Sequence, residues 1–378
     1  MPVSGKVAET NQVPDVTDAR FQLGHHFPEL DGIRGLAALL VIFHHIALYF
    51  PAPPLNGFLK WWLIFTREGF VGVDIFFALS GFLITRILIE TRGKSHFYRN
   101  FYARRVLRLA PPYLITLVLV AIAIPGSGKF LLLSFFYLAN FSPLFGVAMA
   151  YPVLWSLAVE EQFYLIWPWL IRFVSRRSLL IIGSTIVIAS PIARHLAFSR
   201  DDSGLYYTWF RCDGLMWGAL LSIICTSPRA TRLLVRRYAS ATCAIGGLIW
   251  LLCVITPHII KGSTSISEAL IYSGCPMATA GVIGLATVSS NASMLAVFRI
   301  PLLRFAGDIS YWMYLIHYLF VRYFGGVAKR LVTIGHARSD WTIYFFLVLT
   351  VMTPTILSGI AVRRLLELPV LSLKKHFR

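Results

Sequence analysis

An arginine and two histidines flank the apolar run in ELDGIRGLAALLVIFHH, residues 29–45. On a helix, Arg34 and His45 share a face within about 20° and lie about 16 Å apart along the axis. The neighbouring His44 points about 100° away from that face. An imidazole among apolar residues can be a general base at neutral pH, or a core histidine bonded to a backbone carbonyl. The spacing leaves both roles open for His45.

An aspartate lies in the next apolar run, GFVGVDIFFALSGFLI. Ionisable groups at membrane depth are costly, so each is expected to have a function or a specific partner. Asp74 can pair with Arg34, which would be a structural role, or it can orient His45 for chemistry. The sequence alone allows both.

A third motif, PVLWSLAVEEQFYLIWPWL, carries two adjacent carboxylates, Glu160 and Glu161. Ser156, Glu160 and Tyr164 follow one another at intervals of four residues and therefore line one helical face. The alternatives are a functional carboxylate at Glu160 and a charge pair at the outer end of a helix.

Basic residues gather in HFYRNFYARRVLRLAPPY. Arg104 and Arg108 are one turn apart and Arg105 precedes Arg108 by three, which gives a cluster suited to phosphate groups. The same residues also fit the basic anchors of cytoplasmic loops. A polyphosphate cofactor arriving from the cytoplasm would meet this face first.

Two later motifs place more polar groups in apolar surroundings. GDISYWMYLIHYLF aligns Ser310, Tyr314 and His317 on one helical face. RCDGLMWG places Arg211 and Asp213 in or near a span.

Composition identifies the class of protein. Of the 378 residues, 57% are hydrophobic and only 14% are charged, too few charges for a soluble domain. Several apolar runs approach the ~20 residues that cross ~30 Å of hydrocarbon. We expect an all-α polytopic membrane helix bundle of about ten transmembrane helices, plus one re-entrant or interfacial segment at 130–141. The expected spans are 31–50, 70–89, 109–125, 154–173, 178–197, 205–225, 239–257, 268–289, 308–327 and 342–362.

The net charge of +18 comes from basic residues clustered between apolar runs. This pattern indicates membrane orientation rather than nucleic-acid binding. With ten crossings, one side carries 23 Lys and Arg residues and the other carries 10. We therefore expect both termini in the cytoplasm. The five cysteines show no metal-ligand spacing, so no metal is expected.

The motifs taken in order resemble the bacterial membrane acyltransferase family 3, integral-membrane O-acyltransferases that modify surface glycans and related molecules. The matching stretches are LDGIRGLAALLVIFHH, GFVGVDIFFALSGFLIT, FYARRVLRLAPPYLI, LWSLAVEEQFYLIWP, GDISYWMYLIHYLF and the Glu-x-Pro of LELP. They extend over residues 30–369. The domain prediction is a cytoplasmic tail at 1–29, a transmembrane acyltransferase domain at 30–366 and a second cytoplasmic tail at 367–378.

The resemblance implies acyl transfer, often of acetyl, from an acyl-coenzyme A to a hydroxyl of a sugar-containing or lipid-linked acceptor. The family pattern of a basic residue, ten residues and a histidine falls on Arg34 and His45. Its Arg-x-x-Arg falls on Arg105 and Arg108, and its functional glutamate on Glu160. These matches make His45 the expected catalytic histidine and Arg34 its companion at the cofactor.

Two departures from the family pattern stand out. Some members carry an extracytoplasmic esterase-like domain after the membrane part, whereas this sequence ends nine residues after Pro369. We therefore expect a standalone enzyme acting on a lipid-linked glycan, an exopolysaccharide precursor or a small glycoside. His44 is an additional imidazole for which the pattern gives no account.

The resulting hypothesis is that Arg104, Arg105 and Arg108 bind the phosphates of the coenzyme while the thioester reaches His45. His45 deprotonates the acceptor hydroxyl, or forms an acyl-histidine. Other roles expected from the sequence fall on Asp74 and Glu160 as orienting carboxylates, and on Ser156, Tyr164 and His317 as substrate-binding residues.

A rival interpretation is a glycolipid or small-molecule transporter, or flippase, that uses the intramembrane charges as a proton relay. A non-catalytic scaffold would leave the histidine, glutamate and arginines unexplained. Expected partners are the acceptor and membrane lipids but not nucleic acid, and homo-oligomerisation stays open.

Overall fold

The computed structural model describes residues 27–50, 57–198, 205–259, 265–288, 293–333 and 340–372, and these form helices without a β-strand. The predicted all-α class is confirmed for these residues. The longer helices are α1 (Pro28–Tyr49), α3 (Val71–Thr91), α4 (Phe97–Ala123), α6 (Leu154–Phe173), α7 (Arg176–Phe198), α8 (Thr208–Cys225), α9 (Arg232–Ile259), α10 (Ser265–Val288), α11 (Pro301–Thr333) and α12 (Asp340–Val362). Shorter helices are α2 (Phe58–Arg67), α5 (Gly128–Phe135), α13 (Leu368–Ser372) and η1 (Glu68–Phe70), η2 (Ala139–Phe145), η4 (Ser293–Arg299) and the π-helical η5 (Arg363–Glu367).

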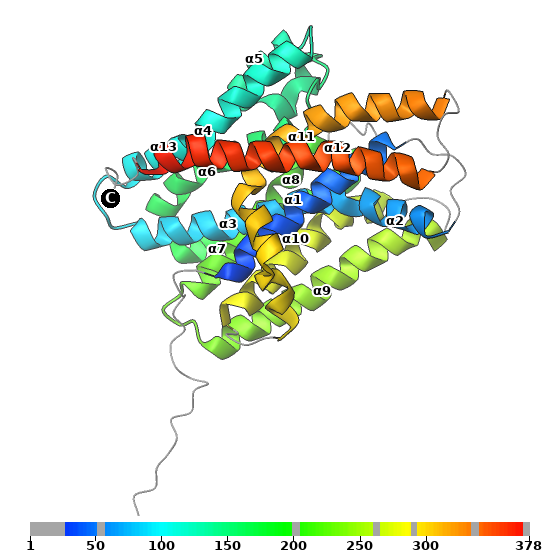
Figure 1. Cartoon of the computed structure of the whole chain (residues 1–378). Coiled ribbons are helices and arrows are strands. Elements are labelled where there is room, and N and C mark those ends of the chain that lie inside the picture. The colour runs from blue at the N-terminus through cyan, green and yellow to red at the C-terminus, as the bar shows by residue number, and fades with distance from the viewer. Residues whose placement is uncertain are drawn as a thin grey trace, which may run out of the picture.

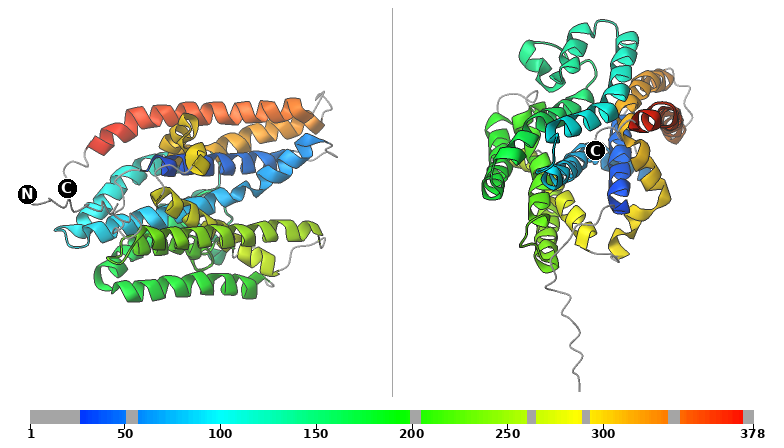
Figure 2. Two further views of the ribbon diagram at one scale, coloured as in Figure 1. Left: turned by 90° about the horizontal axis from the view of Figure 1, so that it is seen from below. Right: turned by 90° about the vertical axis from the view of Figure 1, so that its left-hand side faces the viewer.

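The long helices lie side by side with roughly aligned axes, as Figures 1 and 2 show. In the left view of Figure 2, α12 lies at one edge and α7 at the other. Between them α11 packs on α1, α1 on α3, α3 on α8 and α8 on α7, while α10 packs on α3 and α9 on α10. Helix α3 therefore lies at the centre, in contact with α1, α6, α8 and α10.

Within the part of the chain that the structure describes, seven helical segments are long and apolar enough to cross a membrane, with bounds 28–49, 58–91, 97–123, 176–197, 232–256, 265–288 and 341–370. In the segment that contains α3, 72% of an 18-residue apolar stretch is buried inside the protein, whereas in the segment that contains α12 the corresponding share is 22%. The outer helices thus present apolar surface outward, as contact with lipid requires. Helices α6, α8 and α11 are not among these seven segments. The expected ten crossings therefore stay a prediction.

The ambiguous stretch 130–141 forms neither a long helix nor a strand. It contains the end of α5, which has eight residues, and the start of η2. Eight helical residues extend about 12 Å, less than half the hydrocarbon thickness. The expectation that this stretch does not cross the membrane as one helix agrees with that length.

Glycines bring the central helices into direct backbone contact. A Cβ added at Gly81 of α3 would overlap the carbonyl oxygen of Leu215, and one at Gly218 of α8 would overlap that of Ala78. The pair Gly35 and Gly307 has the same relation between α1 and α11. Small residues at such crossings allow close van der Waals packing where lipid provides no hydrophobic driving force.

The two ends of the chain differ from expectation in detail. Helix α1 begins at Pro28, inside the expected tail 1–29, of which residues 1–26 lie outside the described part. Helix α12 continues through η5 into α13, so residues 367–372 are helical, and 373–378 are again outside. The π-helical turn lies immediately before Pro369, where the ring removes one backbone donor.

Candidate active site in two cavities

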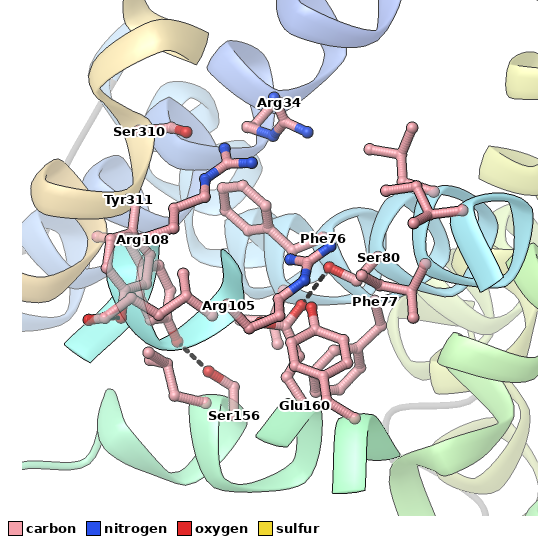
Figure 3. Close-up of a pocket in the computed structure, with 18 residues that line it drawn as sticks. Arg34, Phe76, Phe77, Ser80, Arg105, Arg108, Ser156, Glu160, Ser310 and Tyr311 are labelled. Carbon is pink, nitrogen blue, oxygen red and sulfur yellow. Dashed lines mark hydrogen bonds between the residues drawn. The ribbon is translucent and has the colours of Figure 1, made fainter. Parts of the chain in front are cut away.

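A cavity of about 290 Å³ lies between α1, α3, α4, α6 and α11 (Figure 3). Its lining includes Arg34 of α1, Arg105 and Arg108 of α4 and Glu160 of α6. Three guanidinium groups against one carboxylate leave a formal excess of two positive charges. We call this space the arginine cavity. Arg104 does not line it, because consecutive helical residues point about 100° apart.

The face predicted on α6 lines the arginine cavity. Ser156, Glu160 and Tyr164 all border it. The Ser80 hydroxyl of α3 donates a hydrogen bond to the Glu160 carboxylate, drawn as a dashed line in Figure 3. The Arg105 guanidinium lies over the Tyr164 ring, 5.0 Å from its centroid. These contacts hold the charged groups in place while their remaining hydrogen-bonding positions face the cavity.

A second cavity of about 360 Å³ lies between α1, α3, α8, α10, α11 and residues 152–155 at the start of α6. His44 and His45 both line it, together with Arg211. We call it the histidine cavity. Its aromatic lining consists of Tyr49, Phe70, Trp155, Tyr206, Tyr272, Tyr314 and Tyr318. Aromatic faces with a few polar groups suit a ligand that has apolar ring faces and hydroxyl edges.

His45 is held by a second histidine, which the sequence motifs assign to substrate binding. Its Nδ1 lies 2.9 Å from the carbonyl oxygen of Val41 and 3.1 Å from Nε2 of His317. Nδ1 of His317 lies 3.0 Å from the carbonyl oxygen of Met313. His317 is fully buried and lines neither cavity, so the structure places it behind His45 rather than at a ligand.

These contacts fix the protons on both rings. Carbonyl oxygens only accept, so Nδ1 of His317 carries a proton and its Nε2 is an acceptor when the ring is neutral. Nδ1 of His45 faces a carbonyl and that acceptor, so it also carries a proton. Nε2 of His45 is left with a free lone pair, the form that a general base requires.

His44 also borders the histidine cavity, although it points away from the Arg34 face. Its Nδ1 lies 2.6 Å from the carbonyl oxygen of Arg67, and its ring centre is 5.1 Å from that of His45. The cavity is wide enough that both rings reach it. His45 differs from His44 in having an imidazole behind it.

Asp74 does not take the partner expected from the sequence. Its Oδ1 accepts a hydrogen bond of 2.6 Å from Arg211 Nη2 on α8, and Asp74 lines neither cavity. The expected pairing with Arg34 is not formed, because Asp74 faces Arg211 on α8. The expectation that Asp74 orients His45 stays a prediction. Asp74 instead holds Arg211, whose guanidinium lies 4.1 Å from the ring centre of Tyr272.

A second buried ion pair connects α7, α8 and α10. Arg194 donates bonds of 3.1 and 2.8 Å to the two oxygens of Asp213 and one of 2.5 Å to Ser273. Arg194 is fully buried, whereas the charge count from the sequence places it at the outer end of a span. If Arg194 is left out of the count of loop charges, the side with fewer Lys and Arg residues has 9 instead of 10. The excess of basic residues on the other side remains.

Comparison with known proteins gives these residues a family. The sequence model of a family described as an acyltransferase domain matches residues 27–359 of this chain. The chain belongs to acyltransferase family 3. The resemblance drawn from the motifs is thereby confirmed.

Curated relatives of this acyltransferase family 3 chain include peptidoglycan O-acetyltransferases. The chain is 33% identical over 323 residues to peptidoglycan O-acetyltransferase OatA of Listeria monocytogenes, covering 78% of this chain and 49% of that protein. It is 30% identical over 328 residues to O-acetyltransferase OatA of Staphylococcus aureus, covering 78% and 50%. The chain spans about half the length of these relatives. No solved structure matches it.

Within this family assignment, the structure separates the predicted site residues into two groups. Arg34, Arg105, Arg108, Ser156, Glu160 and Tyr164 line the arginine cavity, while His45 lines the histidine cavity with His317 behind it. Sequence reasoning gave no role to Ser80, Arg211 or Arg194. For Arg194 the available signal was a basic residue within the predicted span 178–197, which called for a buried partner. Among the described residues, no His, Cys, Asp and Glu side chains form a group able to hold a metal ion.

Proposed function

We propose that this chain is a membrane O-acyltransferase that moves an acyl group from cytoplasmic acyl-coenzyme A to a hydroxyl of a carbohydrate-containing acceptor. The acyl group that we propose is acetyl. The observation that carries the proposal is the pair of adjoining cavities. One is rich in arginine and the other holds a histidine in the tautomer of a base. The names of the family and of its relatives support the same reaction class.

The arginine cavity is the proposed donor site. Guanidinium groups bind phosphates through paired, charge-assisted hydrogen bonds, and Arg105 and Arg108 lie on one face of α4, near its cytoplasmic start. Arg108 is exposed at the mouth, whereas Arg34 and Glu160 are partly buried within. The phosphates would bind at the mouth, and the pantetheine arm would carry the thioester inward. Glu160, bonded to Ser80, acts on this side rather than on His45.

The histidine cavity is the proposed acceptor site. Nε2 of His45 takes the proton of an acceptor hydroxyl, whose oxygen attacks the thioester carbonyl carbon. The new carbon–oxygen bond forms as the carbon–sulfur bond breaks, and His45 returns its proton to the departing thiolate. In the covalent variant of this route, Nε2 of His45 first attacks the thioester carbonyl carbon and the carbon–sulfur bond breaks to release the coenzyme A thiolate. The acceptor hydroxyl then attacks the acyl-histidine, the carbon–nitrogen bond breaks, and the hydroxyl proton passes to the thiolate.

The proposal includes a topology. Ten crossings with residues 130–141 as a re-entrant or interfacial segment leave both termini in the cytoplasm of a bacterial inner membrane. The domain division at 1–29, 30–366 and 367–378 belongs to the same proposal. Acyl-coenzyme A is its donor, and no metal takes part. The acceptor is sugar-containing or lipid-linked.

The test uses membranes that contain the full chain, radiolabelled acetyl-coenzyme A and a glycan acceptor fraction. Wild-type membranes should transfer label to the glycan, and His45→Ala should lower transfer by about 10²- to 10⁴-fold, the usual contribution of a general base. Arg236→Ala serves as the matched control, because Arg236 is an exposed arginine on α9 that lines neither cavity. Transfer by His45→Ala at the wild-type rate would refute the assignment.

The same assay separates the enzyme from the transporter that the sequence leaves open. A transporter would move acceptor across sealed vesicles without consuming acetyl-coenzyme A. Release of coenzyme A in proportion to labelled glycan is the outcome expected of the transferase.

A further inference from the structure

The arginine and histidine cavities meet at a thin boundary. Val73 of α3 and Tyr314 of α11 line both of them. Tyr314 is nearly buried, with 7% of its surface exposed, and Val73 has 8% exposed. One layer of side chains therefore separates the two spaces.

Tyr314 forms hydrogen bonds with residues that line each of the two cavities. Its hydroxyl lies 2.5 Å from Ser156 Oγ, which lines the arginine cavity, and donates a bond of 3.1 Å to the carbonyl oxygen of Val153, which lines the histidine cavity. Its ring meets Phe76 on the arginine side at 5.8 Å between centroids and His317 at 6.0 Å. These contacts hold the ring across the boundary.

A second pair of rings continues the layer. Phe77 lines the arginine cavity and Trp155 the histidine cavity, with centroids 6.0 Å apart and planes at 82°. The Arg211 guanidinium lies over both rings, at 5.9 and 5.1 Å. We call Val73, Phe77, Trp155 and Tyr314 the partition.

We propose that, while no acceptor is bound, the partition shields the donor thioester from water on the acceptor side, with Tyr314 as its central residue. This inference rests on the proposed function. A thioester whose carbonyl reaches the boundary can be attacked by an acceptor hydroxyl or by water. Attack by water forms a carbon–oxygen bond and breaks the carbon–sulfur bond, giving a free carboxylic acid and coenzyme A thiol, with one water proton passing to the sulfur. Excluding bulk water from a reacting centre suppresses such side reactions.

Helix α11 supplies its own matched set of variants. Tyr311 lines only the arginine cavity, Tyr314 lines both, and Tyr318 lines only the histidine cavity. Each tyrosine hydroxyl has a hydrogen-bond partner, Leu109 for Tyr311 and Tyr49 for Tyr318. The three alanine variants thus remove the same side chain from the same helix on either side of the partition and within it.

The experiment measures two rates on purified full-length protein with acetyl-coenzyme A: coenzyme A release without acceptor, and acceptor acetylation. Tyr314→Ala should raise acceptor-independent release by roughly tenfold, which equals ~1.4 kcal/mol of barrier, and should lower the acetylated product formed per coenzyme A released. Tyr314→Phe keeps the ring and should hydrolyse at close to the wild-type rate. Tyr311→Ala and Tyr318→Ala should not raise hydrolysis, whatever they do to transfer.

Val73→Ala keeps the inference testable if Tyr314→Ala does not fold as judged by size-exclusion chromatography. It removes two methyl groups from the partition and should raise hydrolysis by a smaller factor. If Tyr314→Ala and Val73→Ala both hydrolyse acetyl-coenzyme A at the wild-type rate, while the wild-type protein acetylates the acceptor, the partition is overturned and the proposed function stands. Equal hydrolysis in all three tyrosine-to-alanine variants would also overturn it. A wild-type protein that never consumes acetyl-coenzyme A would instead overturn the proposed function.

Discussion

Replacing His317 with leucine tests how the buried histidine pair works. Leucine is similar in size, so the fully buried position stays filled. The change removes the acceptor that lies 3.1 Å from Nδ1 of His45, but it leaves the carbonyl oxygen of Val41 at 2.9 Å. His45 therefore keeps its tautomer and loses one of two hydrogen-bond acceptors.

The expected loss of kcat in His317→Leu follows from the loss of one of these two hydrogen bonds. A neutral hydrogen bond contributes about 0.5–1.5 kcal/mol, so kcat should fall by about twofold to about tenfold if the bond supports the reacting form. The KM values for donor and acceptor should change little, because His317 lines neither cavity. His317→Gln can present an amide oxygen as acceptor and should recover part of the loss.

The assay is steady-state acetyl transfer by wild type, His317→Leu, His317→Gln and His45→Ala at matched protein levels. A loss in His317→Leu as large as that in His45→Ala would show that His317 is itself the base. No loss at all would show that Val41 alone holds the ring of His45. Either result would refute a purely positioning role.

Three further predictions address the donor site and the helix contacts. Arg105→Ala should raise the KM for acetyl-coenzyme A by about 10- to about 100-fold, because it removes one charge-assisted hydrogen bond to the donor. The change in kcat should be smaller, and an unchanged KM for the donor would contradict the assignment. Gly218→Ala should destabilise the protein by about 1–3 kcal/mol through overpacking, seen as a lower melting temperature in detergent, whereas Gly247→Ala, where the added Cβ meets open space, should not. Arg194→Met should cost about 3–5 kcal/mol by leaving Asp213 buried without its charge partner, and adding Asp213→Leu should restore much of the melting temperature; no recovery would argue against the pair.

Much of the fold could be predicted because apolar length is a local property. Each expected span overlaps one long helix, since a run of about 20 apolar residues leaves the backbone little alternative in lipid. The helix ends were less accurate. Helix α9 begins at Arg232 rather than 239, and α11 extends over 301–333 rather than 308–327, because helices continue into polar residues beyond the hydrocarbon.

The site could be predicted only as far as one helix at a time. Spacing on α6 correctly grouped Ser156, Glu160 and Tyr164, because helical periodicity fixes which residues share a face. Partners on different helices depend on packing that spacing does not encode. His45 meets His317 across 272 positions, and Asp74 meets Arg211 across 137. The sequence showed that each buried charge needed a partner, but not which one.

The buried pair of Arg194 and Asp213 bears on how the chain is inserted during synthesis. The two residues are 19 positions apart on consecutive helices, α7 and α8. Arg194 lies near the end of α7 and Asp213 near the start of α8, so either one alone opposes insertion by less than the about 2.5–3.5 kcal/mol of a charge at a helix centre. Once paired, each charge is neutralised by its neighbour. We therefore expect α7 to wait at the translocon for α8, and the two helices to move into the bilayer together as a hairpin.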